Sequence, residues 1–161
     1  MDNMANPANT ASDATSQPAR RHWLSVLAKA PAAALEEAWQ ALDDKPDYSP
    51  LRPAQTGLVM VRGRMGGSGD AFNLGEMTVS RCSVRTADGR IGHGYAAGRD
   101  KRHAELVALF DAVLQQPEAA SRLHSGLIEP LAAEQRRRHG EKARESAATK
   151  VEFFTMVRGE D

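Results

Sequence analysis

Basic residues and glycines gather in one stretch of the chain, between positions 57 and 105. Positions 62 to 103 carry eight Arg or Lys against four Asp or Glu, whereas the whole chain is neutral, with 21 residues of each sign. Guanidinium groups and free backbone amides both donate hydrogen bonds to phosphate-like oxygens. If the protein binds an anion, we expect the site in this stretch.

The first candidate site is a glycine loop, in which Arg64 precedes Gly66, Gly67 and Gly69. The amides of such a loop can form a nest around an anion, with Arg64 beside it. The loop is not a P-loop, because no Lys-Ser/Thr pair follows the glycines, and it lacks the Rossmann spacing. The alternative is a hairpin loop that needs glycine for positive φ angles. Both interpretations stand at this point.

The second candidate site is a predicted helix start that carries Arg99, Lys101 and His103. Asp100 fits the N-cap position, where its carboxylate accepts from the amide of residue 102 or 103. Free amides and the positive end of the helix dipole favour a bound anion, although a capped, solvated first turn fits the same residues. Basic residues are unfavourable beside that end of the dipole, so we predict a role in substrate or partner binding.

No other residues point to catalysis. His93, His103 and the lone Cys82 do not match the spacing of a Zn or Fe site. No Ser-His-Asp or Cys-His order stands out, and no carboxylate pair is marked for acid–base chemistry. We therefore assign no catalytic residue, no metal and no cofactor to this chain.

The composition predicts one soluble domain. The length of 161 residues, 41% of them hydrophobic and 26% charged, is that of an ordinary globular protein. Overall neutrality argues against binding to nucleic acid or to an anionic membrane. A single cysteine excludes an internal disulfide, and neither a membrane-spanning run nor a secretory signal is visible. We expect a cytoplasmic protein.

The N-terminal part is predicted to contain a tail and two helices. Residues 1–19 lack periodicity and large apolar side chains, so we expect a disordered tail, followed by one domain over 20–161. An apolar stripe at helical spacing, with Trp23 and Leu27 on it, predicts a helix that ends near Pro31. A second helix over 35–42 would complete a helical hairpin.

The middle part is predicted to form an antiparallel meander. We expect strands near 58–61, 75–86 and 91–97, the last two joined by a hairpin turn at Asp88-Gly89. In the first strand we predict that the face with Val59 and Val61 belongs to the core. One face of the third strand carries Gly92 and Gly94, which indicates that another backbone or a ligand comes close.

Helices return in the C-terminal part. One follows Asp100 and ends before Pro117, a short one covers 120–127, and a long polar one covers 131–149 and is solvated or rests on a partner. Phe153 and Phe154 lie in a β-like segment and need burial in a further strand or in another subunit. The predicted fold is α+β: a meander of three or four strands packed with an N-terminal helical hairpin and C-terminal helices.

Several strings, collinear from about residue 20 to the end, resemble the PhnG subunit of the bacterial carbon–phosphorus lyase system. They are 56–59 (TGLV), 64–69 (RMGGSG), 98–105 (GRDKRHAE) and 151–159 (VEFFTMVRG), supported by 21–28 (RHWLSVLA) and 127–131 (LIEPL). The resemblance implies a core complex with PhnH-, PhnI- and PhnJ-type subunits. That complex would attach an alkylphosphonate to C1 of the ribose of ATP, displacing adenine and forming ribose 1-methylphosphonate 5-triphosphate.

The resemblance supplies no catalytic residue for this chain. It implies an assembly or substrate-site subunit. From the residues themselves we add the hypothesis that Arg64 with the glycine loop, and Arg99, Lys101 and His103, face phosphates or partners. Phe153 and Phe154 would lie at a partner interface. Of these two roles, partner docking is favoured over phosphate binding. The alternative function is a free-standing transferase that binds a phosphate ligand. A nucleic-acid-binding module is disfavoured, because the chain is neutral and lacks interleaved aromatic residues.

Overall fold

The computed structural model describes residues 8–148, so Phe153 and Phe154 lie outside the described part. The helices and strands are α1 (Ala8–Leu27), α2 (Ala32–Gln40), β1 (Tyr48–Arg64), β2 (Ala71–Thr86), β3 (Ile91–Ala97), α3 (Lys101–Val113), α4 (Pro117–Leu123) and α5 (Glu129–Ala148). A π-helical segment, His124–Ile128, joins α4 to α5. The predicted α+β class is confirmed.

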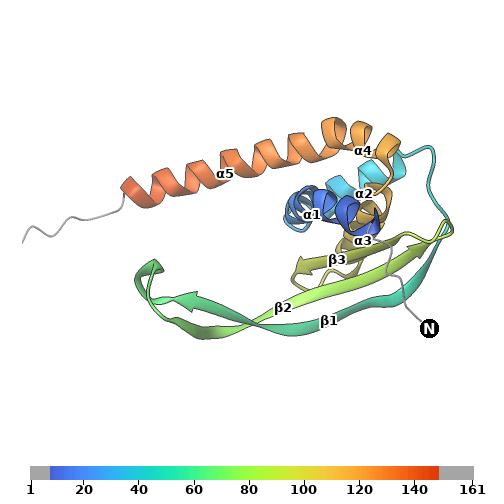
Figure 1. The fold of residues 1–161 in the computed structure, drawn as a ribbon. Helices are drawn as coiled ribbons and strands as arrows, with labels where there is room; N and C mark the ends of the chain where they lie inside the picture. The colour runs from blue at the N-terminus through green and yellow to red at the C-terminus, as the bar shows by residue number, and fades with distance from the viewer. Residues whose placement is uncertain (1–7, 149–161) are drawn as a thin grey trace, which may run out of the picture.

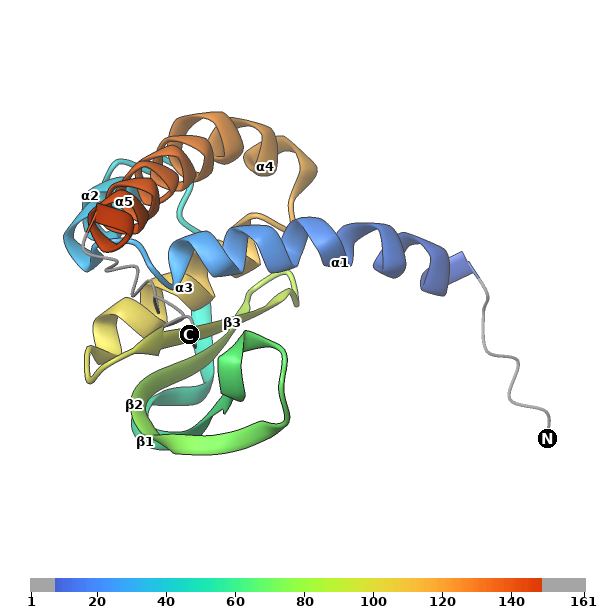
Figure 2. The same ribbon diagram turned by 90° about the vertical axis from the view of Figure 1, so that its left-hand side faces the viewer.

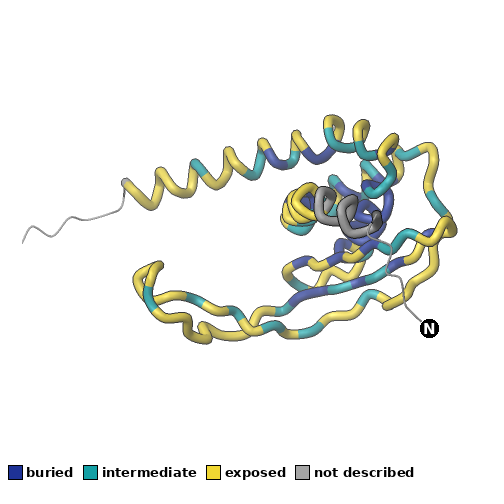
Figure 3. The backbone as a smooth tube through the Cα atoms, in the orientation of Figure 1, coloured by how far each residue is buried: buried dark blue, intermediate teal, exposed yellow. Residues whose placement is uncertain are grey.

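The three strands form one antiparallel sheet in the order β1-β2-β3. Figure 1 shows that all the helices lie on one side of this sheet, with α3 directly on it. Figure 2 shows α1 crossing above α3. The buried residues gather where α1, α2 and the π-helical segment pack around α3 and the short strand β3 (Figure 3). In the part of the chain that the structure describes, the opposite side of the sheet carries no helix.

The close contact between α3 and β3 depends on glycine. A Cβ atom at Gly94 would lie 1.9 Å from the Ala104 carbonyl oxygen, and one at Gly92 would lie 1.9 Å from that of Ala108. Both distances are far below van der Waals contact, so no larger side chain fits between this helix and this strand. The predicted close approach at the glycine face is confirmed, and the approaching group is the α3 backbone.

Asp111 ties α1, α3 and β3 together. Its buried carboxylate accepts hydrogen bonds from Arg20 Nη2 at 2.7 Å, Trp23 Nε1 at 2.9 Å and the His93 amide at 2.8 Å. Arg20 and Gln115 also donate to the Ile91 carbonyl. These side chains satisfy polar backbone groups of β3, an edge strand whose free groups would otherwise invite further pairing.

The first strand is longer than predicted. β1 begins at Tyr48, ten residues before the predicted start, and includes Pro50 and Pro53. Both prolines fit because β1 is an edge strand and its register with β2 shifts around Arg52. The predicted core face of Val59 and Val61 is wrong: both are only half-buried, because β3 and α3 do not reach that part of the sheet.

The N-terminal helix also begins earlier than expected. The structure includes Ala8 in α1, and Pro18 lies inside the helix. The division into a tail over 1–19 and a domain over 20–161 stays a prediction. Over residues 8–148, no helix combines the length and apolar character that crossing a membrane requires.

The contact between α3 and β3 leads to a prediction with a matched control. We expect Gly94→Ala to lower the free energy of unfolding by about 3 kcal/mol, because the added methyl group must push α3 off the sheet. Gly57→Ala adds the same methyl group in β1, where nothing lies within 4 Å, and should cost less than about 1 kcal/mol. Urea unfolding followed by circular dichroism measures both. Equal losses would contradict the packing argument.

The Asp111 network predicts a second stability effect. Asp111→Asn keeps the shape of the side chain but removes the charge and replaces one acceptor oxygen by a donor. Several buried or half-buried donors then lack a partner, and we expect a loss of about 3 kcal/mol. Asp43→Asn, on an exposed loop, is the control and should change stability by less than about 0.5 kcal/mol. A loss below 1 kcal/mol at Asp111 would refute this role.

Candidate functional site

The glycine loop lies at the tip of a two-stranded ribbon, which we call the distal arm and define as residues 58–78. β3 pairs with β2 only from Val79 to Arg85. Between Val79 and the glycine loop, the sheet therefore consists of β1 and β2 alone. Figure 1 shows this arm projecting from the core in the same direction as α5. The glycine loop is therefore far from the packed helices.

The loop has the geometry of a tight hairpin connection. Gly66 and Gly67 have φ angles of 60° and 84°, a region that favours glycine. The Gly69 amide donates to the Met65 carbonyl at 2.8 Å, and Arg64 Nη1 donates to the Gly69 carbonyl at 3.1 Å. The need for positive φ is thus met by Gly66 and Gly67. Arg64 closes the loop, and its binding role stays a prediction.

The basic residues at the start of α3 lie in different environments. Asp100 is the N-cap, as predicted, and its carboxylate accepts from the His103 amide at 3.0 Å. Arg99 and Lys101 are exposed. His103 is buried, and its Nε2 atom lies 3.0 Å from the Leu27 carbonyl oxygen, so its imidazole joins α3 to the end of α1. A direct ligand contact would require this ring to leave the core.

Arg102, the remaining cation of this turn, is already paired. Its guanidinium donates to both carboxylate oxygens of Glu36 on α2 and to Glu105. The hydrogen bond from Arg102 holds the pKa of Glu36 at about 2, well below its ordinary value. Arg102 thus links α2 to α3, which leaves Arg99 and Lys101 as the exposed cations of the predicted site.

The structure does not bring the two candidate sites together. The chain before α3 is anchored where the Gly98 amide donates to the Thr78 carbonyl. The glycine loop begins eight residues further along β2, at Asp70, which corresponds to about 26 Å of extended strand. The cluster of positive charge in the sequence is therefore divided among separate surfaces.

A serine–histidine pair was missed in the sequence. Ser83 Oγ lies 2.9 Å from His93 Nδ1 across β2 and β3, on the side of the sheet without helices. The predicted turn at Asp88-Gly89 already implied this register. No carboxylate among residues 8–148 orients the ring, and the pair lies on an open sheet surface, so the described part of the chain does not supply the third group of a catalytic triad.

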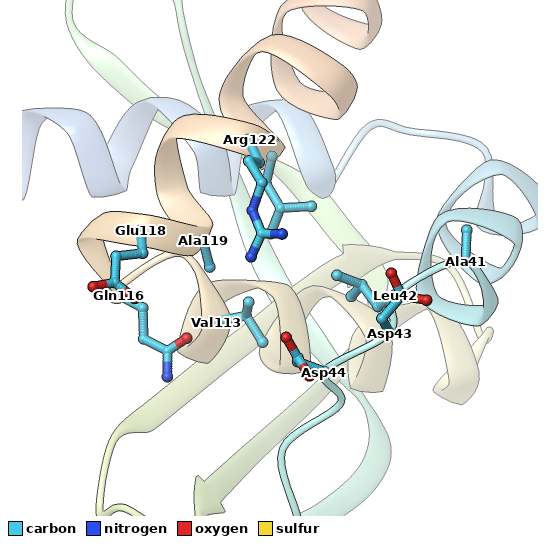
Figure 4. A pocket seen from close by; sticks show the side chains of 10 residues that line it. Ala41, Leu42, Asp43, Asp44, Val113, Gln116, Glu118, Ala119 and Arg122 are labelled. Atoms are coloured by element: carbon cyan, nitrogen blue, oxygen red, sulfur yellow. The ribbon is translucent and has the colours of Figure 1, made fainter.

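The cavity in Figure 4 does not suit an anionic substrate. It lies between the end of α2 and α4 and has a volume of about 380 Å³. Asp43, Asp44 and Glu118 line it, with Arg122 as the one cation among the lining residues. The surplus of carboxylates would repel phosphate, and none of the predicted binding residues lies there.

The described residues also offer little for metal or thiol chemistry. Within residues 8–148, no group of three or more His, Cys, Asp and Glu side chains is placed to hold a metal ion. Cys82 is buried, which raises the pKa of its thiol, and its Sγ atom contacts the Arg52 carbonyl at 3.5 Å. A buried, protonated thiol is a poor nucleophile.

Comparison with known proteins shows the family. The family model described as "Phosphonate metabolism protein PhnG" matches residues 18–159. A protein of Rhizobium meliloti (strain 1021), named "Alpha-D-ribose 1-methylphosphonate 5-triphosphate synthase subunit PhnG", is 50% identical over 161 residues, which cover 98% of this chain and 100% of that protein. The resemblance found in the sequence is therefore confirmed, and the chain belongs to the PhnG family of phosphonate metabolism proteins.

Proposed function

We propose that this chain is a subunit of an α-D-ribose 1-methylphosphonate 5-triphosphate synthase and has no activity by itself. The observation that carries this proposal is the 50% identity, along nearly the whole chain, to the R. meliloti protein of that name. The complex would combine ATP with an alkylphosphonate and release adenine. PhnH-, PhnI- and PhnJ-type proteins are the proposed partners, and the cytoplasm, where ATP is available, is the proposed location.

The distal arm supports a role in assembly. Six large apolar side chains on it are between 43% and 74% exposed: Leu58, Met60, Met65, Phe72, Leu74 and Met77. Soluble monomers rarely expose so many together, and a two-stranded ribbon alone is only marginally stable in water. Burial against another subunit would stabilise the ribbon and remove this surface from water.

The distribution of chemical groups also favours a subunit over a free-standing enzyme. Among residues 8–148, the glycine loop and the α3 cations are on separate surfaces, and the cavity beside α2 is acidic. A substrate that carries a triphosphate and a phosphonate needs several cations around one cleft. Other subunits would have to complete such a cleft, with Arg64 or Lys101 at its border.

The arm provides the first test of this proposal. We expect the full chain, co-expressed with the PhnH-, PhnI- and PhnJ-type proteins of its own organism, to elute with them as one particle in size-exclusion chromatography. Leu58→Ser combined with Leu74→Ser should weaken assembly at least about 30-fold, because both side chains lose apolar burial in the interface.

The control is Leu51→Ser, which changes a similarly exposed leucine in β1 outside the arm and should leave assembly intact. Separate elution of the unmodified subunits would refute the proposal. Release of adenine from ATP and methylphosphonate by the chain alone, measured by liquid chromatography, would favour the free-standing transferase instead.

Two substitutions distinguish partner docking from substrate binding. Arg64→Ala and Lys101→Ala both change exposed side chains, so the fold should persist. If these cations dock partners, we expect each variant to weaken assembly about tenfold and to leave adenine release per assembled complex unchanged. Normal assembly with lost adenine release would instead assign them to the phosphate groups of the substrate.

A further inference from the structure

The side of the sheet without helices carries a row of unpaired arginines. We call this surface the outer face. Because Gly92 and Gly94 face α3, their neighbours His93 and Tyr95 on β3 point away from it. In β2, Ser83 pairs with His93 and Arg81 pairs with Tyr95. On the other side of β2, Arg52 of β1 pairs with Ser83 and Gln55 pairs with Arg81. Arg85, opposite Ser49, continues the row.

Over residues 8–148, no carboxylate lies in register with these arginines on this face. Within the described residues, Arg52, Arg81 and Arg85 form no ion pair. Some arginines elsewhere are paired, as Arg102 is with Glu36 and Arg137 with Glu134, whereas in the described part of the chain Arg64 and Arg99 are not. What distinguishes the outer face is that three such arginines share one surface of the sheet. The outer face therefore carries a local charge of about +3 on a neutral chain. Among the described residues, no carboxylate offsets the repulsion between these arginines.

Neutral polar groups hold Arg81, the central arginine of the row, in place. Arg81 Nη1 is 3.5 Å from the Tyr95 hydroxyl, and the Gln55 amide oxygen, in the orientation that satisfies both groups, accepts from Arg81 Nε at 3.0 Å. Ser83 similarly holds His93. Side chains that are ordered before binding lose less conformational entropy when a ligand arrives.

We propose that the outer face docks an acidic protein surface of another synthase subunit, which presents carboxylates to Arg52, Arg81 and Arg85. Guanidinium groups pair with carboxylates through two parallel hydrogen bonds, and Arg and Tyr are the residues that concentrate in interface centres. An open sheet surface presents its side chains side by side, as a protein partner requires, whereas small ligands favour concave sites. This inference rests on the proposed function.

Charge reversal tests the inference in the assembled complex. The remaining synthase subunits, purified together, are titrated with the full chain, and interferometry measures the dissociation constant. Arg81→Glu combined with Arg85→Glu should raise this constant at least about 30-fold, because carboxylates then face carboxylates. Arg136→Glu combined with Lys142→Glu, which reverses two exposed charges on α5, should change it less than about threefold. Circular dichroism checks that both variants fold.

Chemical coupling identifies the partner group. Arg85→Lys keeps the charge and introduces an amine, which a carbodiimide joins to a carboxylate in direct contact. We expect mass spectrometry to find a conjugate between position 85 and an Asp or Glu of another subunit, and none from position 136 in Arg136→Lys.

Three results would overturn the inference. An unchanged dissociation constant after charge reversal, or an assembled complex without a conjugate at position 85, would exclude an acidic partner. Normal assembly with lost binding of inorganic triphosphate would assign the face to a small anion. If the unmodified chain does not assemble, the proposed function itself fails, and that outcome is visible before any variant is made.

Discussion

The direct contact between the backbones of α3 and β3 is the constraint on which the rest of the structure depends. Gly92 and Gly94 let the helix approach until no side chain fits between, and the buried carboxylate of Asp111 fixes its orientation through hydrogen bonds to β3 and α1. α1 and α2 then pack around α3. Because the helix is short and lies over β3, only the part of the sheet near β3 gains a core.

The exposed surfaces follow from that restricted core. β1 and β2 continue beyond the end of β3, so within residues 8–148 no helix covers the apolar residues of the distal arm, which are exposed. Among residues 8–148, no second layer covers the outer face of the sheet, which carries arginines without ion pairs. Both features would be unfavourable in a free monomer, and both are expected of a subunit whose neighbours cover them. The structure therefore agrees with the subunit role implied by the family.

Much of the fold was predictable, and the failures have physical causes. The Asp88-Gly89 turn, the Asp100 cap and the close approach at the glycine face depend on local geometry, and all three predictions are confirmed. The early part of β1 was missed because prolines disfavour central strands, and only the sheet order shows that β1 is an edge strand. The binding roles of Arg64 and Lys101 stay predictions.

The sequence by itself determined the fold class, the order of the elements and the family, because periodicity, turn residues and the short strings typical of the family are properties of neighbouring residues. Only the tertiary structure decided where the charges lie. Of eight basic residues that are close along the chain, two lie on the arm, two on the outer face and three at the start of α3, while Arg90 pairs with Asp88 in the β2–β3 turn. They are separated because the long antiparallel strands carry them along the length of the sheet. The tertiary structure also placed His103 in the core. Its ring reaches the Leu27 carbonyl at the end of α1, a contact between residues 76 positions apart.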